Sequence, residues 1–230
     1  MVISSQSNSA KPKPAGLRNP PITRLRILAA AKHEFAKNGM GGARVDVIAR
    51  RAKTNKRMLY HYFGNKDDLF SKTVEDAYGK FRDAEAALEI EKLAPVEALA
   101  RLVAFTWQYY LENPEFITLV NSENLHMARH IKSSRRMTDL SRQFVGRMRD
   151  LLKRGRVMGD FRPDVDAVQL IITIAAIGYH YLTNRYTGTV VYERDLMSED
   201  AVKERLAFNI ETVMRLVCSG RALTQQGYAI

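Results

Sequence analysis

Two short helical segments in tandem are the feature that most restricts the fold of this chain. The first covers residues 45–51 and the second about 56–62, and Asn55 between them can act as an N-cap. Apolar residues recur on one face of each segment, at Val45, Ile48, Ala49, Ala52, Leu59 and Phe63. Segments this short are not stable alone, so we expect both to pack on the helix before them.

Helical periodicity continues along the rest of the chain, and no convincing alternation of apolar and polar residues is present. The pattern predicts an all-α protein of about nine helices. Asn38-Gly39 is expected to stop the first helix, Pro95 and Pro114 to start two others, and Gly188 to lie in a loop. The expected helices span 21 or 22–37, 45–51, 56–62, 65–88, 95–112, 114–130, 137–157, 164–184 and 198–219.

The positive charge of the chain is confined to its N-terminal quarter. Residues 1–65 hold 13 Lys or Arg against Glu34 and Asp46, which accounts for the whole net charge of +11. Residues 66–230 hold 23 basic and 23 acidic residues. A one-sided basic module of this kind is typical of proteins that bind a polyanion such as DNA.

Hydrogen-bond donors occupy the polar face around the second short helix. The face carries Lys53, Thr54, Asn55, Lys56, Arg57 and His61. Two short helices joined by about four residues are the geometry that lays a second helix into the major groove. We therefore expect a helix-turn-helix over residues 44–63 whose exposed side chains contact bases and phosphates.

Three motifs in this region resemble the TetR family of bacterial regulators: Ile48-Ala49, Tyr60-His61-Tyr62-Phe63 and Lys66-Asp67-Asp68-Leu69. The match covers about residues 21–80, and the remainder resembles the family in length and helix order only. The helix with Tyr179-His180-Tyr181 is also similar to the subgroup around the pyrimidine-utilisation regulator.

The resemblance implies a function and a division into domains. A disordered basic arm (1–20) would precede the DNA-binding domain (21–80), and residues 81–230 would bind an effector and dimerise. The chain would be a sequence-specific repressor that binds a palindromic operator as a homodimer and is released by a small molecule. Tyr60 resembles the phosphate-contacting tyrosine of the family. Lys66 lies at the start of the fourth expected helix, where free N–H groups and the helix dipole also favour a phosphate.

Two positions depart from the family pattern. Ala43 and Arg44 stand where the family has a threonine that caps the first short helix, so the cap must come from elsewhere, while Arg44 can still reach a phosphate. Lys53 stands where the family has a glycine in the left-handed conformation. A lysine in that conformation costs about 1 kcal/mol and adds a charge beside DNA.

The C-terminal part holds candidates for an effector pocket and a dimer interface. Aromatic, Met and amide side chains suited to an apolar pocket are Trp107, Tyr110, Phe116, Asn121, Asn124, Met127, Phe144, Met148, Tyr179 and His180. Candidates for a four-helix interface between two subunits are the small residues Ala175 and Gly178 and the stripe Val202, Leu206, Ile210, Val213 and Val217.

Two alternatives stay open. Glu123, His126 and His130 are spaced i, i+3 and i+7 on one expected helix, a spacing that can ligate a divalent metal in a metal-sensing regulator, although no fourth ligand is evident. A nonspecific nucleoid-type DNA-binding protein would need the basic module but no pocket.

Several classes of protein are disfavoured. No nucleophile–base arrangement or Gly-rich phosphate loop is visible, so we expect neither an enzyme nor a cofactor. The apolar run Ala167–Leu182 is too short and too polar for a membrane span. The lone Cys218 excludes an internal disulfide and is consistent with the cytoplasm.

Overall fold

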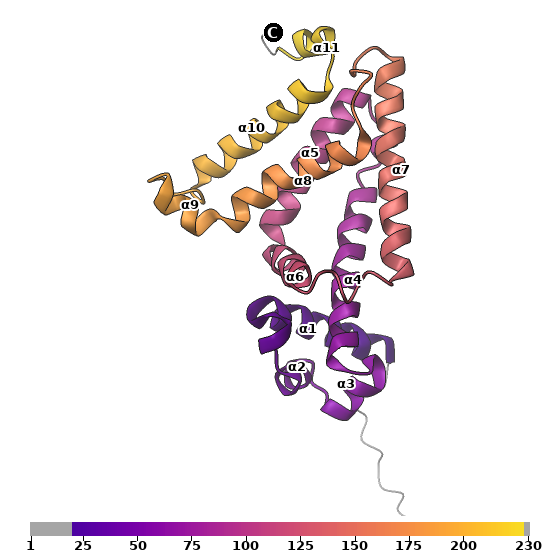
Figure 1. The fold of residues 1–230 in the computed structure, drawn as a ribbon, viewed down its shortest axis with the longest axis vertical. Coiled ribbons are helices and arrows are strands. Elements are labelled where there is room, and N and C mark those ends of the chain that lie inside the picture. The colour runs from indigo at the N-terminus through magenta and orange to yellow at the C-terminus, as the bar shows by residue number, and fades with distance from the viewer. Residues whose placement is uncertain (1–19, 228–230) are drawn as a thin grey trace, which may run out of the picture.

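The computed structural model describes residues 20–227, which form a bundle of α-helices (Figure 1). The all-α prediction is confirmed, because the described residues contain no β-strand and their one isolated bridge joins Phe161 to Cys218. The expected arm over residues 1–20 lies outside this range except for Pro20. The helices are α1 (Pro20–Gly42), α2 (Val45–Arg51), α3 (Lys56–Phe63), α4 (Lys66–Ala86), the 3₁₀ helix η1 (Ile90–Lys92), α5 (Pro95–Glu112), α6 (Pro114–Leu125), α7 (Arg135–Val157), α8 (Ala167–Thr183), α9 (Arg185–Val191), α10 (Glu199–Val217) and α11 (Gly220–Gln225).

Helices α1 to α3 gather at one end of the molecule, and α5 to α11 build the other (Figure 1). Helix α4 belongs to both parts, because it contacts α1 and α3 at its beginning and α5, α6 and α7 further along. One buried cluster surrounds Phe35 and Phe70 and extends into α5 and α6. A second cluster, around Leu99 and Val213, holds the far end together. No helix in the described part of the chain is long and apolar enough to cross a membrane.

The sequence pattern underestimates the number of helices: the described residues form eleven α-helices instead of about nine. Helix α9 occupies the region near Gly188 that was expected to be a loop. Gly188 is buried there, and a Cβ on it would lie 2.7 Å from Leu196 Cδ1, so the glycine permits close packing rather than breaking the helix. Helix α11 follows α10 as a separate helix because Ser219 supplies a new N-cap to Ala222 N.

Helix α6 ends at Leu125, five residues before the expected end at His130. Met127 and Ala128 have φ values of 55° and 56°, a left-handed conformation that an α-helix cannot contain. The Glu123 carboxylate stabilises this reversal, since it accepts hydrogen bonds from the backbone N–H groups of His130 (2.8 Å) and Ile131 (3.2 Å). The hydrogen bonds of Glu123 to His130 and Ile131 therefore stabilise a turn where the apolar periodicity of the segment predicts a continuing helix.

Gly155 of α7 offers a direct test of packing in the second core cluster, which contains Phe161 and is called the far core below. A Cβ at this position would lie 2.0 Å from Phe161 Cδ2, a contact that requires the buried ring to move. We expect Gly155→Ala to lower the free energy of unfolding by about 2–3 kcal/mol. Gly146 lies on the same helix with nothing within 4 Å of its Cβ position. Gly146→Ala should therefore leave stability unchanged or raise it by up to about 1 kcal/mol, and urea denaturation of both variants would reveal the contrast.

Candidate functional site

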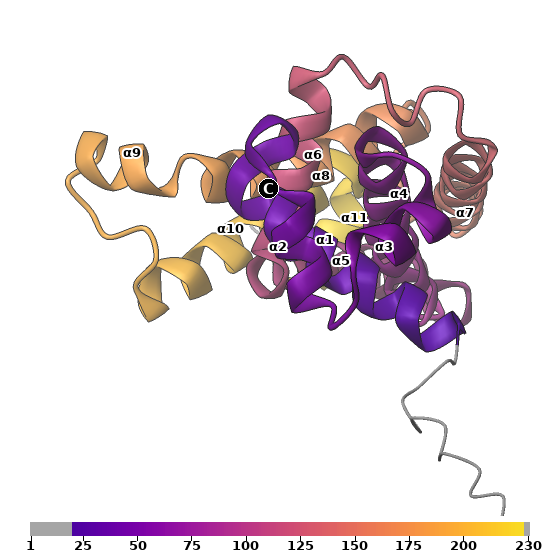
Figure 2. The same cartoon turned by 90° about the horizontal axis from the view of Figure 1, so that it is seen from below.

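The helix-turn-helix lies at the end of the molecule opposite α11, where α2 and α3 face solvent (Figures 1 and 2). Ile48 of α2 and Leu59 of α3 are fully buried in the core that α1 also builds. Asn55 caps α3 as expected, because its side chain accepts a hydrogen bond from Met58 N at 2.9 Å. These contacts fix α3 relative to α1 and leave its polar face exposed.

The turn between α2 and α3 is held by an arginine that the sequence pattern did not single out. Lys53 has φ 50°, so the left-handed conformation expected at this position is confirmed. Arg26 of α1 donates from Nε to Ala52 O and from Nη2 to Lys53 O, both at 3.0 Å. The guanidinium therefore fixes the two carbonyls on either side of the strained turn. Arg26 lies 26 residues before Ala52, and no local motif links them.

A buried glutamate of α1 positions the start of α2. Arg44 is the N-cap residue of α2, and its side chain makes no capping hydrogen bond. Instead, the Glu34 carboxylate accepts from Arg44 N at 3.1 Å and from Asn38 Nδ2 at 3.0 Å. The side chain that stabilises this helix start thus comes from another helix, which agrees with the absence of threonine at Ala43 and Arg44.

Most of the side chains predicted to bind DNA lie on one exposed surface. Arg44, Lys53, Asn55, Lys56, Arg57, Tyr60 and His61 are exposed, while Thr54 and Lys66 are partly buried. Tyr60 is 45% exposed, and its hydroxyl has no partner among residues 20–227. It is free to donate to a phosphate. Lys66 donates instead to Gly41 O at 3.1 Å, a contact that ties α4 to the end of α1.

The Arg44 guanidinium is paired with a carboxylate on the same surface. Its Nη2 lies 3.1 Å from Asp46 Oδ2, although the arginine side chain remains 71% exposed. Desolvation raises the pKa of Asp46, but hydrogen bonds from its own backbone N–H and from Arg44 outweigh that effect and lower the pKa below its ordinary value. An ionised Asp46 therefore orients Arg44 across the beginning of α2.

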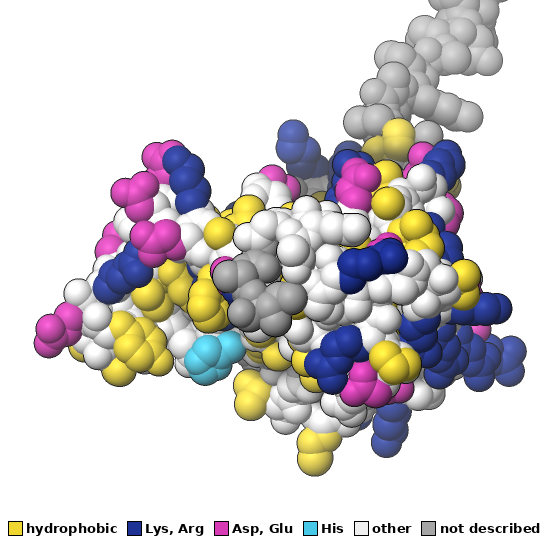
Figure 3. Space-filling view, turned by 90° about the horizontal axis from the view of Figure 1, so that it is seen from above, with side chains coloured by type: hydrophobic (Ala, Val, Ile, Leu, Met, Phe, Trp, Pro, Cys, Tyr) yellow, Lys and Arg dark blue, Asp and Glu magenta, His cyan; other side chains and the backbone are white. Residues whose placement is uncertain are grey.

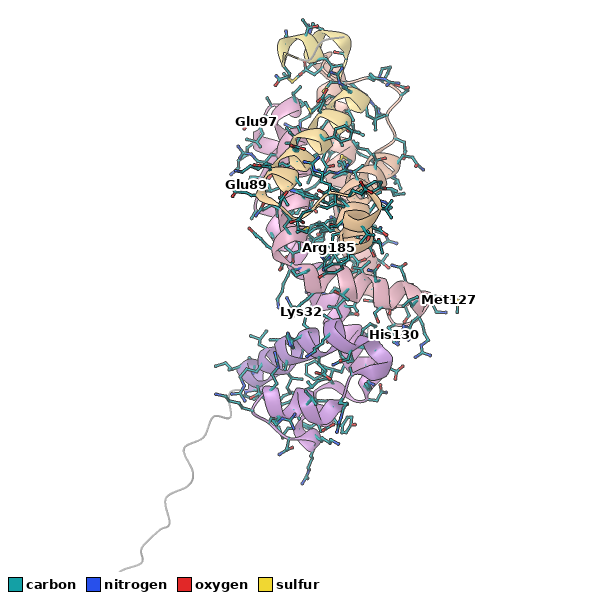
Figure 4. All side chains as sticks on the ribbon, turned by 90° about the vertical axis from the view of Figure 1, so that its left-hand side faces the viewer. Lys32, Glu89, Glu97, Met127, His130 and Arg185 are labelled. Atoms are coloured by element: carbon teal, nitrogen blue, oxygen red, sulfur yellow. The ribbon has the colours of Figure 1, made fainter. Side chains whose placement is uncertain are left out.

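The start of α4 joins the helix-turn-helix to the body. Asn65 and Asp68 form a reciprocal capping box at the start of α4. Asp67 lies between them, and its Oδ1 accepts from Arg129 Nη2 at 2.6 Å. His130 lies beside this pair, with Nε2 3.4 Å from Asp67 Oδ1. Figure 4 labels His130 at the boundary between the lower helices and the body.

The residues with metal-ligand spacing are engaged with each other and with the backbone. His130 Nδ1 donates to Glu123 Oε2 at 2.6 Å, and both side chains are almost fully buried. His126 Nδ1 donates to Ser122 O at 2.7 Å. No group of three or more candidate ligands that could hold a metal ion occurs among the described residues. The arrangement therefore serves as a structural junction and gives no support to a metal site.

An internal cavity of about 230 Å³ lies in the body between α4, α5, α6, α7 and α8. Four of the predicted pocket residues line it: Tyr110, Phe116, Phe144 and Tyr179. Helix α4 contributes Tyr78, Phe81 and Arg82, which the pocket prediction missed. Ala175, which was predicted at the dimer interface, also lines the cavity. The remaining lining residues are Leu102, Thr106, Val120, Ile171 and Ile174.

The other predicted pocket residues lie elsewhere. Trp107 is buried in the core, where its ring contacts Tyr181, and Met148 belongs to the far core cluster. Asn121 does not line the cavity. Its Oδ1 accepts a hydrogen bond from the hydroxyl of Tyr179, which does line it. Asn124, Met127 and His180 are exposed, and Met127 projects into solvent from the end of α6 (Figure 4). The apolar spacing indicates which residues lie near the core but not which of them face the cavity.

Most of the predicted dimer stripe faces the interior of its own subunit. Val213 and Val217 are fully buried in the far core, and Val202, Leu206 and Ile210 pack at core edges. Gly178 lies against Trp107 and Tyr110, since a Cβ there would be 3.5 Å from each ring. The exposed apolar side chains of α8 and α10 are others: Val168, Ile172, Phe208 and Leu216, with exposures of 40–60%. Figure 3 shows hydrophobic side chains gathered on the projecting part that α8, α9 and α10 build.

Comparisons with known proteins agree with this architecture. The family model "Bacterial regulatory proteins, tetR family" matches residues 27–73, and "Tetracyclin repressor-like, C-terminal domain" matches residues 95–213. The transcriptional repressor NicS of Pseudomonas putida is 38% identical over 193 residues, which cover 84% of this chain and 91% of NicS. The repressor SCO4008 of Streptomyces coelicolor is 32% identical over 160 residues, 69% of this chain and 79% of the relative.

The fold is also similar to that of solved regulators. The crystal structure of the regulator SCO4942 from Streptomyces coelicolor superposes with a TM-score of 0.66 at 26% identity and covers 85% of this chain and 98% of the neighbour. The matches extend over both the helix-turn-helix and the body. This chain therefore belongs to the TetR family of DNA-binding transcriptional regulators.

Proposed function

We propose that the protein is a repressor that binds a palindromic operator as a homodimer and is released when a small molecule enters the internal cavity. The observation that carries the proposal is the course of α4. Its first turn holds Lys66 beside α3, and Tyr78, Phe81 and Arg82 of the same helix line the cavity. At 1.5 Å per residue, about 18 Å of continuous helix separates Lys66 from Tyr78.

A rigid connection of this kind can convert occupancy of the cavity into movement of the DNA-binding end. A ligand that fits the cavity only when α4 is displaced binds one conformation more tightly than the other. The displacement moves Asn65-Lys66 and, through the bond of Lys66 to Gly41 O, the end of α1. The separation of the two recognition helices in a dimer would then change, and operator affinity with it.

Two copies are required because one helix-turn-helix covers too few base pairs for specific binding. The exposed apolar side chains of α8 and α10 support a face-to-face contact between two subunits through Val168, Ile172, Phe208 and Leu216. Residues 21–80 act as the DNA-binding domain in this arrangement. Residues 81–230 bind the partner and, together with Tyr78 near the end of the first domain, the effector. Arg44, Lys53, Lys56, Arg57 and Tyr60 would contact DNA from each subunit.

Footprinting with the full chain on genomic fragments tests the proposal. We expect protection of a short palindrome whose half-sites are about 10 base pairs apart, in line with a two-fold symmetric dimer. A screen of small molecules should then identify one that raises the melting temperature of the protein and releases the complex. Equal affinity for unrelated duplexes at about 0.15 M salt would contradict the proposal and favour a nonspecific nucleoid-type protein.

A further inference from the structure

Six of the thirteen side chains that line the internal cavity are aromatic. Rings from α4, α5, α6, α7 and α8 surround it: Tyr78, Phe81, Tyr110, Phe116, Phe144 and Tyr179. Several of them pack on one another, with Phe81 and Phe116 centroids 5.3 Å apart and Tyr110 and Phe116 stacked at 6.0 Å. Walls of this kind favour a flat aromatic ligand over a branched aliphatic one, since rings stack in offset or edge-to-face contacts. A volume of about 230 Å³ lies below the usual range of roughly 300–1,000 Å³ and limits the ligand to a small molecule.

One charged side chain lines the cavity. Among the lining residues, all of which the structure describes, Arg82 alone carries a charge. Its guanidinium carbon lies 3.6 Å from the centroid of the Phe144 ring and 4.9 Å from that of Phe81. These ring contacts hold the guanidinium flat against the wall of the cavity.

The charge of Arg82 is only partly neutralised. Arg82 Nη1 lies 2.5 Å from Glu85 Oε2, and Arg147 Nη2 lies 3.3 Å from the other oxygen of the same carboxylate. The Glu85 side chain is only 1% exposed. Two guanidinium groups therefore share one buried carboxylate, and the cluster retains an excess positive charge beside the cavity. The Arg82 and Arg147 side chains are 16% and 29% exposed, so water screens this excess charge incompletely and an anion in the cavity would stabilise it.

Phenol groups near Arg82 offer further hydrogen-bond donors. The hydroxyls of Tyr78 and Tyr110 make no hydrogen bond within the described part of the chain. Burial raises the pKa of both tyrosines above the ordinary value, so both phenols stay protonated and can donate. The hydroxyl of Tyr179, by contrast, already donates to Asn121. Arg82, Tyr78 and Tyr110 thus present N–H and O–H donors to the cavity for which the protein supplies too few acceptors.

We infer that the cavity binds a small aromatic carboxylate, with the ring between the aromatic walls and the carboxylate on Arg82 and the phenols of Tyr78 and Tyr110. This inference rests on the proposed role of the cavity as the effector site and adds the chemical class of the effector. Pairing of a carboxylate with a guanidinium gives both charge and geometric specificity. A neutral molecule of the same shape leaves the excess charge unpaired.

Matched pairs of probes test the charge requirement on the full-length protein. Benzoate, 4-hydroxybenzoate and phenylacetate are compared with benzamide, 4-hydroxybenzamide and phenylacetamide by isothermal titration calorimetry. We expect at least one carboxylate to bind, and to bind at least tenfold more tightly than its amide. Butyrate, an acid without a ring, should bind more weakly than the aromatic acids.

Variants of the two arginines that share Glu85 locate the charge. Arg82→Gln should weaken binding of the best carboxylate about ten- to hundredfold and leave binding of its amide within about threefold. Arg147→Gln removes the same charge beside the same Glu85 but lies outside the lining of the cavity, so it should lower carboxylate affinity clearly less than Arg82→Gln and keep the acid bound more tightly than its amide. Tyr110→Phe, which removes only a hydroxyl, serves if Arg82→Gln does not fold, and it should weaken the carboxylate more than the amide, because the hydrogen bond to the ionised acceptor is the stronger one.

The results separate this inference from the proposed function. If an amide or another neutral molecule binds as tightly as its carboxylate and releases the operator, the cavity is an effector site but the inference is wrong. If Arg82→Gln and Tyr110→Phe both bind the carboxylate as wild type does, it is wrong as well. If neither the carboxylates nor the amides bind, the inference is wrong. The proposed function is then decided separately, by the screen for small molecules that release the DNA complex.

Discussion

Replacing Lys56 and Arg57 together with alanine should weaken operator binding about a thousandfold. Both side chains are exposed at the start of α3, next to the cap at Asn55. Removal of one cationic side chain from the DNA costs about 1–3 kcal/mol, and the double variant removes two from each subunit of the proposed dimer. Even at about 1 kcal/mol for each of the four, the total is about 4 kcal/mol, or about three powers of ten in affinity.

The control for this experiment is a pair of cations far from α3. Arg149 and Lys153 are exposed on α7, in the body of the molecule, and their replacement with alanine removes the same charge. This variant should bind the operator within about threefold of wild type in fluorescence anisotropy. Equal weakening by both double variants would mean that α3 has no special role.

Salt dependence distinguishes the roles of Lys56 and Arg57 when each is replaced singly. The slope of log affinity against log salt becomes shallower by about 0.9 for each phosphate that the variant no longer neutralises. A side chain that reads a base edge instead relaxes the sequence preference when it is removed. Affinity measured over a range of salt concentrations, on the operator and on a scrambled duplex, therefore assigns each cation to a phosphate or to a base.

The parts of this interface that could be predicted from sequence are those set by near neighbours. Asn55 caps α3 and Asn65 pairs with Asp68 over three residues, so both caps can be identified from spacing alone. The left-handed Lys53 could be predicted because it stands where the TetR family has a glycine in that conformation. Arg26 and Glu34 contact residues that lie 26 and 10 positions further along the chain. Nothing in the sequence around either residue distinguishes it from an exposed charged residue, so these two contacts could not be predicted.

The body is harder to predict for a related reason. Periodicity identifies the buried face of a helix but not the element that covers it. The stripe with Val213 and Val217 is therefore predicted to meet a second subunit, whereas α10 buries it against its own core. The large apolar side chains of α10 that are exposed, and so able to meet a partner, are Phe208 and Leu216, and neither belongs to that stripe. Arg82 is likewise indistinguishable from the other arginines until α4, α5 and α7 are placed around it.

The second large effect is expected at Glu123, whose carboxylate holds the segment between α6 and α7. It is 3% exposed and accepts three hydrogen bonds: from His130 Nδ1 (2.6 Å), His130 N (2.8 Å) and Ile131 N (3.2 Å). Glu123→Ala leaves all three partly buried donors without this acceptor, while Met127 and Ala128 remain in a strained left-handed conformation. We expect a loss of about 3–5 kcal/mol in the free energy of unfolding.

Urea denaturation at one fixed protein concentration measures this loss, because the stability of the proposed dimer would depend on concentration. Glu97→Ala is the matched control: it removes an exposed carboxylate from an i,i+4 pair with Arg101 and should cost at most about 0.5 kcal/mol. Glu123→Gln keeps one acceptor oxygen and should fall between the two. Since His130 also lies beside Asp67 at the start of α4, the same variants should alter operator affinity. If Glu123→Ala were as stable as Glu97→Ala, the left-handed turn at Met127 and Ala128 would not depend on this carboxylate, and other contacts, such as Arg129–Asp67 and Ser71 Oγ–His130 O, would hold the junction.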